Sequence, residues 1–186
     1  MKNIHHLLNM NRLRIYLTVF LPVLMLFLVS CGSNRNTDAG DNRTKFNEIK
    51  ELVESREFQV EHEWAMPLGS GNINLIGNPN SIRFQKDSID LFLPYFGVRH
   101  MGGGYNTEGG LKYQGPVRNL EIVENHSRNL EISFETIQDN ENLDFSITIY
   151  PNGNVYTTVN SSQRNSISYR GDIMDLPEKY KKDSKR

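Results

Sequence analysis

From Phe58 onward, hydrophobic and polar residues alternate along the chain with a period of two. Within residues 143–149, for example, Asp144, Ser146 and Thr148 separate four apolar residues. Such alternation gives a strand one buried and one solvated face, as in antiparallel sheets. The same pattern occurs at residues 58–63, 73–75, 82–84, 89–93, 120–122, 130–135, 143–149, 155–158 and 167–170.

The segments between these alternating runs have the composition of tight turns. Asn152-Gly153 suits a two-residue hairpin, and residues 77–80 (Gly-Asn-Pro-Asn) form a second turn signal. The connections are too short for the helical crossovers that parallel strands need. We therefore predict an antiparallel meander of about eight or nine strands, as a curled sheet or partly closed barrel.

A helical period precedes the strands. Thr44 is a candidate N-cap, and the helix is expected to end near Ser55 or Arg56. The apolar stripe at helical spacing consists of Phe46, Ile49, Leu52 and Val53. The predicted fold class is therefore mainly β within α+β, with an N-terminal helix packed on the sheet.

The N-terminus reads as a secretory signal. Basic residues and no acidic ones precede an apolar run at 15–29, and Leu28-Val29-Ser30-Cys31 follows the pattern of the lipobox of bacterial lipoproteins. A transmembrane helix is the first alternative, but about fifteen apolar residues are fewer than the roughly twenty required, and Pro22 interrupts them. The second alternative is that Cys31 is an ordinary residue at a signal site.

This interpretation divides the chain into four parts. Residues 1–30 form a lipoprotein signal peptide, 31–43 a flexible tether that begins at the palmitate-bearing Cys31, 44–178 a single domain, and 179–186 a charged tail. Gly32 after the cysteine favours the outer membrane, facing the periplasm, over the inner membrane. Display at the cell surface is the other placement, although the tether lacks an acidic run directly after Cys31.

Charge and cysteine content narrow the classes of function. Loss of the three basic residues of the signal changes the net charge from −1 to −4, which gives no basis for nucleic-acid binding. Cys31 is the only cysteine, so the domain has neither a disulfide nor a thiolate metal site.

The Gly- and Tyr-rich segment after Phe96 is the best candidate for a binding site. It lacks the Gly-Lys-Ser/Thr ending of a phosphate loop, and no helical pattern follows it. A loop on a rigid scaffold often carries binding residues. The candidate residues are Tyr95, Tyr105, Tyr113, Gly102, Gly103 and Gly104.

The spacing of residues in the sequence supports neither a catalytic site nor a metal site. His62, His100 and His126 lack ligand spacings, and His62 lies on the strand face opposite its acidic neighbours, which suggests a satisfied or surface histidine. No Gly-x-Ser-x-Gly elbow occurs. We predict no cofactor, no metal and no enzymatic activity. Arg164 and Arg170 are expected to form structural pairs with carboxylates across the sheet.

Residues 93–97 (Leu-Pro-Tyr-Phe-Gly), the Gly/Tyr loop and residues 161–171 (Ser-Ser-Gln-Arg-Asn-Ser-Ile-Ser-Tyr-Arg-Gly) resemble a family of Bacteroidetes lipoproteins, domain of unknown function 4251. The resemblance covers about Phe46 to Asp172. It implies an envelope location and a single domain, and it carries no catalytic residue.

Two classes of function follow from these patterns. The first is a non-catalytic, lipid-anchored envelope module that binds a partner protein or glycan through the loop from His100 to Lys112. The second is a barrel that carries a small apolar ligand, since a closed barrel can hold one. A hydrolase ranks third, because a pair of acidic residues acts on a glycosidic bond only at a defined separation.

Overall fold

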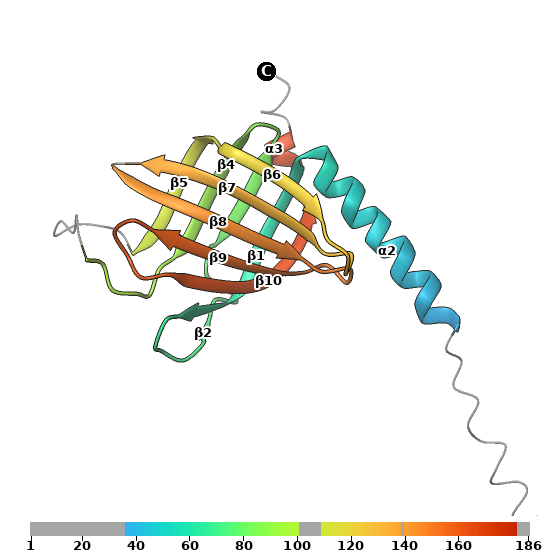
Figure 1. Ribbon diagram of the computed structural model, residues 1–186, viewed down its shortest axis with the longest axis horizontal. Coiled ribbons are helices and arrows are strands. Elements are labelled where there is room, and N and C mark those ends of the chain that lie inside the picture. The colour runs from blue at the N-terminus through green and yellow to red at the C-terminus, as the bar shows by residue number, and fades with distance from the viewer. Residues whose placement is uncertain (1–35, 101–108, 139, 182–186) are drawn as a thin grey trace, which may run out of the picture. The chain divides into compact units, whose positions relative to one another are not determined.

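The computed structural model describes residues 36–100, 109–138 and 140–181, and it consists mainly of antiparallel β-structure (Figure 1). The chain divides by contacts into two units, between Ala39 and Gly40. Its elements are α2 (Asn36–Ser55), β1 (Glu57–Pro67), β2 (Ile73–Asn74), β3 (Ser81–Gln85), β4 (Ser88–Pro94), β5 (Gly110–Pro116), β6 (Arg118–Glu124), β7 (Leu130–Gln138), β8 (Glu141–Ile149), β9 (Asn154–Ser161), β10 (Ile167–Asp175) and α3 (Glu178–Lys181).

The strands form one nearly closed barrel. Their order is β5-β4-β3-β1-β10-β9-β8-β7-β6, with β2 paired to β1, so sequential strands are neighbours and the first strand pairs with the last. This confirms the predicted meander and its partial closure. The opening lies between β5 and β6, which a single residue, Val117, connects.

β5 and β6 form no hairpin, because eight antiparallel pairings in series give these two strands the same direction, and the chain only bends between them. Pro116 ends β5 and lacks an N–H donor for a ladder. Asn119 has φ 51°, and the pairing of β6 with β7 shifts register between Arg118 and Glu121. A bulge of this kind bends the strand and increases its twist. The two strands therefore diverge directly after their connection.

Helix α2 ends at Ser55, as the sequence predicts. Arg56 follows with φ 56°, and its N–H donates to the Val53 carbonyl, which closes the last turn. The buried stripe consists of Phe46, Ile49 and Val53. The helix begins at Asn36 rather than at Thr44, so residues 36–43 are helical where the composition predicts a tether. Once the docked turns are formed, each further residue that is fixed adds one hydrogen bond, so the helix extends more readily than it starts.

The barrel interior is filled by apolar side chains. Phe58 stacks on Phe84 with ring centroids 4.4 Å apart, Phe84 meets Phe134 edge-on at 5.5 Å, and Phe134 stacks on Phe145 at 4.6 Å. All four rings are buried. Offset and edge-on aromatic pairs of this kind add to the stabilisation from buried area. The residues that were predicted to point inward from the strands thus form the core.

The barrel has two distinct ends. The helix end, at the right of Figure 1, holds α2 with the β6–β7 and β8–β9 turns. The opposite end, which we call the loop end, holds the β1–β3, β4–β5, β7–β8 and β9–β10 connections. Pairing of Pro67 with Ile167 and the hydrogen bond from Asn165 N–H to the Val98 carbonyl bring three of these connections together.

Candidate functional site at the loop end

The first part of the β4–β5 connection is held against the β9–β10 connection like a short added strand. Asn165 N–H donates to the Val98 carbonyl (3.0 Å), and His100 N–H donates to the Gln163 carbonyl (2.7 Å). Arg99 and Arg164 form an antiparallel bridge between the two segments. The His100 ring adds a contact of 2.5 Å from Nε2 to Asn165 Oδ1. The start of the predicted binding loop is therefore fixed by the scaffold.

Tyr95 also holds this segment in place, through its hydroxyl group. It directly follows β4, and its hydroxyl lies 2.9 Å from the Asn165 carbonyl and 3.0 Å from the Val98 carbonyl. Burial raises the pKa of this phenol, and the nearby Arg164 charge opposes the increase. The hydroxyl therefore remains a neutral hydrogen-bond donor.

Glu141 is the centre of a buried ion-pair network at this end. Its carboxylate accepts two hydrogen bonds from Arg164, from Nε at 2.7 Å and Nη2 at 2.9 Å, and one from Ser161 Oγ at 2.5 Å. Arg99 Nη2 lies 3.5 Å from Glu141 Oε2. The Glu141 and Arg164 side chains are 7% and 12% exposed. The two-pronged Arg geometry fixes the orientation of both groups.

The charges of this network set the protonation state of Glu141. Burial by itself raises the pKa of its carboxyl, but hydrogen bonds from Arg164 and Ser161, together with the Arg164 and Arg99 charges, outweigh burial and lower it. The Arg164 guanidinium also lies 5.2 Å from the centre of the Tyr95 ring. The cluster is therefore an internally satisfied, charged clamp on the loop.

The predicted pairing of late-strand arginines with carboxylates is confirmed for Arg164, which pairs with Glu141. Arg170 has no described carboxylate within ion-pair distance, and its Nη2 lies 3.8 Å from Met66 Sδ. The sequence interpretation missed Glu141 itself. A signal was present, because Glu141 has the same strand phase as the buried Leu143 and Phe145.

The predicted binding residues are separated by the fold. Tyr95 belongs to the loop end, whereas the Tyr113 hydroxyl donates to the Pro116 carbonyl (2.5 Å) at the other end of β5. Gly102, Gly103, Gly104 and Tyr105 lie outside the described residues, as does Cys31. Phe96 and Val98, which were not among the predicted binding residues, are 42% and 58% exposed beside the clamp.

His62 is buried in the barrel. Its Nε2 lies 3.0 Å from Thr157 Oγ1, while Nδ1 has no hydrogen-bond partner among the described residues. Burial lowers the pKa of His62 from 6.5 to about 4, so the ring is neutral at physiological pH. The prediction that this residue faces away from Glu61 and Glu63 is confirmed, and the ring is only half satisfied.

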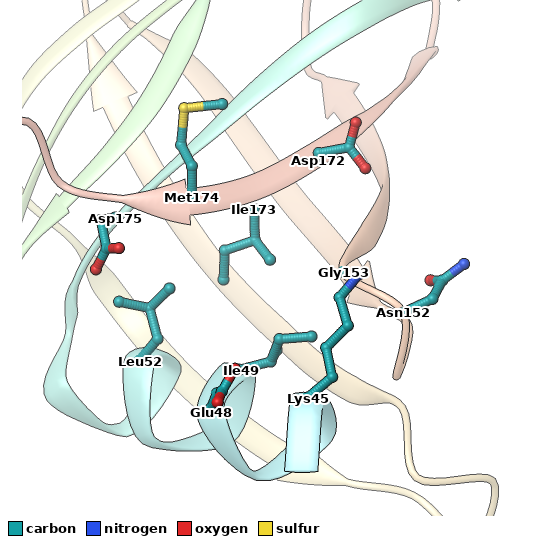
Figure 2. Close-up of a pocket in the computed structure, with 10 residues that line it drawn as sticks. All are labelled: Lys45, Glu48, Ile49, Leu52, Asn152, Gly153, Asp172, Ile173, Met174 and Asp175. Atoms are coloured by element: carbon teal, nitrogen blue, oxygen red, sulfur yellow. The ribbon is translucent and has the colours of Figure 1, made fainter. Parts of the chain in front are cut away.

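A groove of about 570 Å³ lies between α2 and β10 (Figure 2). Ile49, Leu52 and Ile173 turn toward one another and form its floor, and charged groups of both elements stand at its rim. These rim groups are Lys45, Glu48, Asp172 and Asp175. The lining combines apolar packing with solvated charges.

Two further features concern only the described residues. No cluster of three or more His, Cys, Asp or Glu side chains there is arranged to hold a metal ion. No helix within residues 36–100, 109–138 and 140–181 combines the length and the apolar character needed to cross a bilayer.

By its fold, the protein is one of the small, barrel-like β domains with an N-terminal helix. A family model, "Domain of unknown function (DUF4251)", matches residues 41–173, and the chain belongs to this family. A DUF4251 family protein from Bacteroides eggerthii has a similar crystal structure, with a TM-score of 0.56 and 14% identity over 71% of this chain and 88% of that chain. That likeness concerns the fold. No curated protein matches the sequence.

Proposed function

We propose that this protein is a lipid-anchored module of the bacterial cell envelope that binds a partner protein or glycan through its loop end, without catalysis. The observation that carries the proposal is the clamp of Glu141, Arg164 and Tyr95. It holds the start of the His100 to Lys112 loop and leaves Phe96 and Val98 exposed. Exposed apolar residues on a fixed segment are typical of an interaction site.

The same geometry argues against catalysis by the clamp. Arg164 and Ser161 both bond to the Glu141 carboxylate, and its pKa is lowered, so it is a poor proton donor or acceptor near neutral pH. The stacked phenylalanines of the interior also disfavour the alternative function as a carrier of an apolar ligand. Native mass spectrometry of the purified protein is expected to show no co-purified ligand.

Lipidation of Cys31 is the second part of the proposal. It rests on the lipobox-like pattern and predicts an outer-membrane anchor facing the periplasm, with the cell surface as the other placement. The chain enters the barrel unit through α2, at the end opposite the loops. Cys31→Ala should abolish palmitate labelling in cells and release the protein from the membrane fraction. Retained label in this variant contradicts the lipid anchor.

Site-specific crosslinking tests the loop end. A photo-reactive amino acid at Val98 should form a defined adduct in intact cells, and the same amino acid at Val123 is the control. Val123 is similarly exposed, at 45% against 58%, but lies on β6 toward the helix end. Tyr105→Ala with Gly103→Ala should reduce the Val98 adduct without changing thermal unfolding. Equal adducts at the two positions, or an adduct that these substitutions leave unchanged, contradict the assignment.

A further inference from the structure

The outer face of the barrel carries a row of side chains that the loop-end proposal does not use. Pairing registers place one residue from each of five adjacent strands in line across the sheet. On β7 to β10 the chain neighbours of each row residue are buried, so the row lies on the outward face, and on β1 Trp64 follows a bulge and pairs with the outward Arg170. This outer row consists of Glu131 on β7, Thr148 on β8, Tyr156 on β9, Arg170 on β10 and Trp64 on β1.

Three neighbours in the outer row are recognition residues by their chemistry. Trp64 is the only tryptophan of the chain, and it stands half-buried on the outside rather than in the core. Tyr156 is 37% exposed. Arg170 lies between them, exposed, with its Nη2 3.8 Å from Met66 Sδ and no described carboxylate in ion-pair range. Trp, Tyr and Arg are the residue types that dominate binding energy at interfaces.

A second row beside this one is made of hydroxyl groups. The same registers align Ser133, Ser146, Thr158 and Ser168 across β7 to β10. Thr158 Oγ1 and Ser168 Oγ lie 3.1 Å apart. Hydroxyl side chains both donate and accept hydrogen bonds and turn to suit their partner. Tyr156 and Arg170 are thus bordered by groups that match the hydroxyls of a sugar, and on β1 the row continues with Met66 beside Trp64.

Charge and composition separate the possible occupants of this face. Acidic residues lie on it in strands β6 to β10, namely Glu121, Glu131, Glu135, Asp144 and Asp172, and they repel nucleic acids and other polyanions. The outward positions of β7 to β9 are mainly hydroxyl, amide and acidic side chains, whereas the core of a protein interface is predominantly apolar. A neutral, hydroxyl-rich polymer fits this surface best.

The spacing of the aromatic rings selects an extended sugar chain. Tyr156 and Trp64 stand two strands apart, which corresponds to roughly 9.5 Å at the usual separation of paired strands. This is close to the two-residue repeat of an extended β-1,4-linked hexose chain, so alternate sugar rings meet the two aromatic faces. The negative face of an aromatic ring attracts the C–H groups of a sugar face.

We propose that the outer row binds a neutral, extended β-1,4-linked glycan, with Tyr156 and Trp64 stacking on alternate sugar rings and Arg170 donating hydrogen bonds to the hydroxyls between them. This site is separate from the loop end and independent of the proposed function. A partner protein held at the loop end and a glycan held on the sheet face use different residues.

Tryptophan fluorescence offers a direct test, because Trp64 is the only tryptophan in the chain. The full-length chain, purified in mild detergent, is titrated with the β-1,4-linked hexamers of glucose and of N-acetylglucosamine. The α-1,4-linked glucose hexamer serves as a ligand of different shape. A saturable change in Trp64 emission is expected with at least one β-1,4 hexamer and none with the α-1,4 hexamer.

Two variants and one control decide whether the outer row is responsible. Tyr156→Ala and Arg170→Ala should each weaken the affinity by about tenfold or more. Tyr150→Ala should leave it unchanged, since Tyr150 is similarly exposed, at 40%, but lies at the β8–β9 turn of the helix end. No emission change at millimolar β-1,4 hexamer overturns the proposal and leaves a protein partner for this face. Full affinity in both row variants, or equal binding of the α-1,4 hexamer, overturns it as well.

Discussion

The side-chain amide of Asn80 makes both backbone hydrogen bonds of His62. Asn80 Oδ1 accepts from His62 N–H at 2.7 Å, and Asn80 Nδ2 donates to the His62 carbonyl at 2.9 Å. Strand β3 pairs with β1 only as far as Val60, and β2 pairs with β1 from Trp64. The amide therefore completes the ladder at the gap between two partner strands, inside the barrel wall.

Asn80→Ala removes the side-chain amide that pairs with the β1 backbone where no strand does. It leaves a buried N–H and a buried carbonyl of β1 without partners, and each costs about 1–3 kcal/mol. We expect the free energy of unfolding to fall by about 2–6 kcal/mol in chemical denaturation. The matched control is Asn78→Ala, because the Asn78 side chain is exposed and only its backbone carbonyl bonds to Asn80. Similar losses in the two variants would show that the amide bridge is unimportant.

Burial of His62 predicts a loss of stability in acid. The pKa of its ring is lowered from 6.5 to about 4 in the fold, so the unfolded chain binds more protons between these values. This contribution is complete above pH 6.5 and is lost as the pH falls through this window, on the order of 3 kcal/mol in all. Denaturant titrations at pH 7, 5.5 and 4 measure it.

His62→Leu is the comparison for this pH dependence. The substitution places an apolar side chain at this buried position and removes the titrating group, so stability should vary less between pH 7 and 4. Other groups, such as Glu141, titrate in both proteins and cancel in the difference. An unchanged pH slope in the leucine variant contradicts the role assigned to His62.

The Glu141–Arg164 pair should be energetically coupled, because both side chains are buried. Removal of one partner leaves the other charge buried without compensation, which costs about 3–5 kcal/mol. A double-mutant cycle with Glu141→Gln and Arg164→Met measures the coupling energy from unfolding curves. The exposed control is Lys50–Glu124, with the same 2.7 Å separation but side chains 39% and 34% exposed. There we expect a much smaller coupling energy, because solvent screens the exposed pair. Equal coupling in the two cycles is the contrary result.

Gly171 allows β1 and β10 to approach each other where the barrel closes. A Cβ at this position would overlap the Glu61 carbonyl and the His62 Cα, both of which are backbone. Gly171→Ala therefore forces the first and last strands apart and should cost about 3 kcal/mol or more. Gly71→Ala is the control, since nothing lies within 4 Å of a Cβ there. Thermal unfolding compares the two variants, and an unchanged transition for Gly171→Ala is the result that contradicts this account.

Local pattern determined the elements of this protein, because each face of a strand and each stripe of a helix is chosen by its own sequence. The alternation predicted the meander and the strand phase that includes Phe58, and the helical period predicted the end of α2 near Ser55. The candidate site was only partly accessible in this way. Tyr95 was identified, but Tyr113 lies at the other end of its strand.

Only the tertiary structure decided which distant segments meet. The closing of the barrel by β1 and β10, its opening between β5 and β6, and the meeting of Glu141, Arg164 and Tyr95 all depend on contacts between residues far apart in sequence. Alternation gives the face that a side chain occupies, but it contains no information on the register between strands. Because register aligns Trp64 with Arg170 and Tyr156, the outer row, too, is a product of the fold rather than of any local motif.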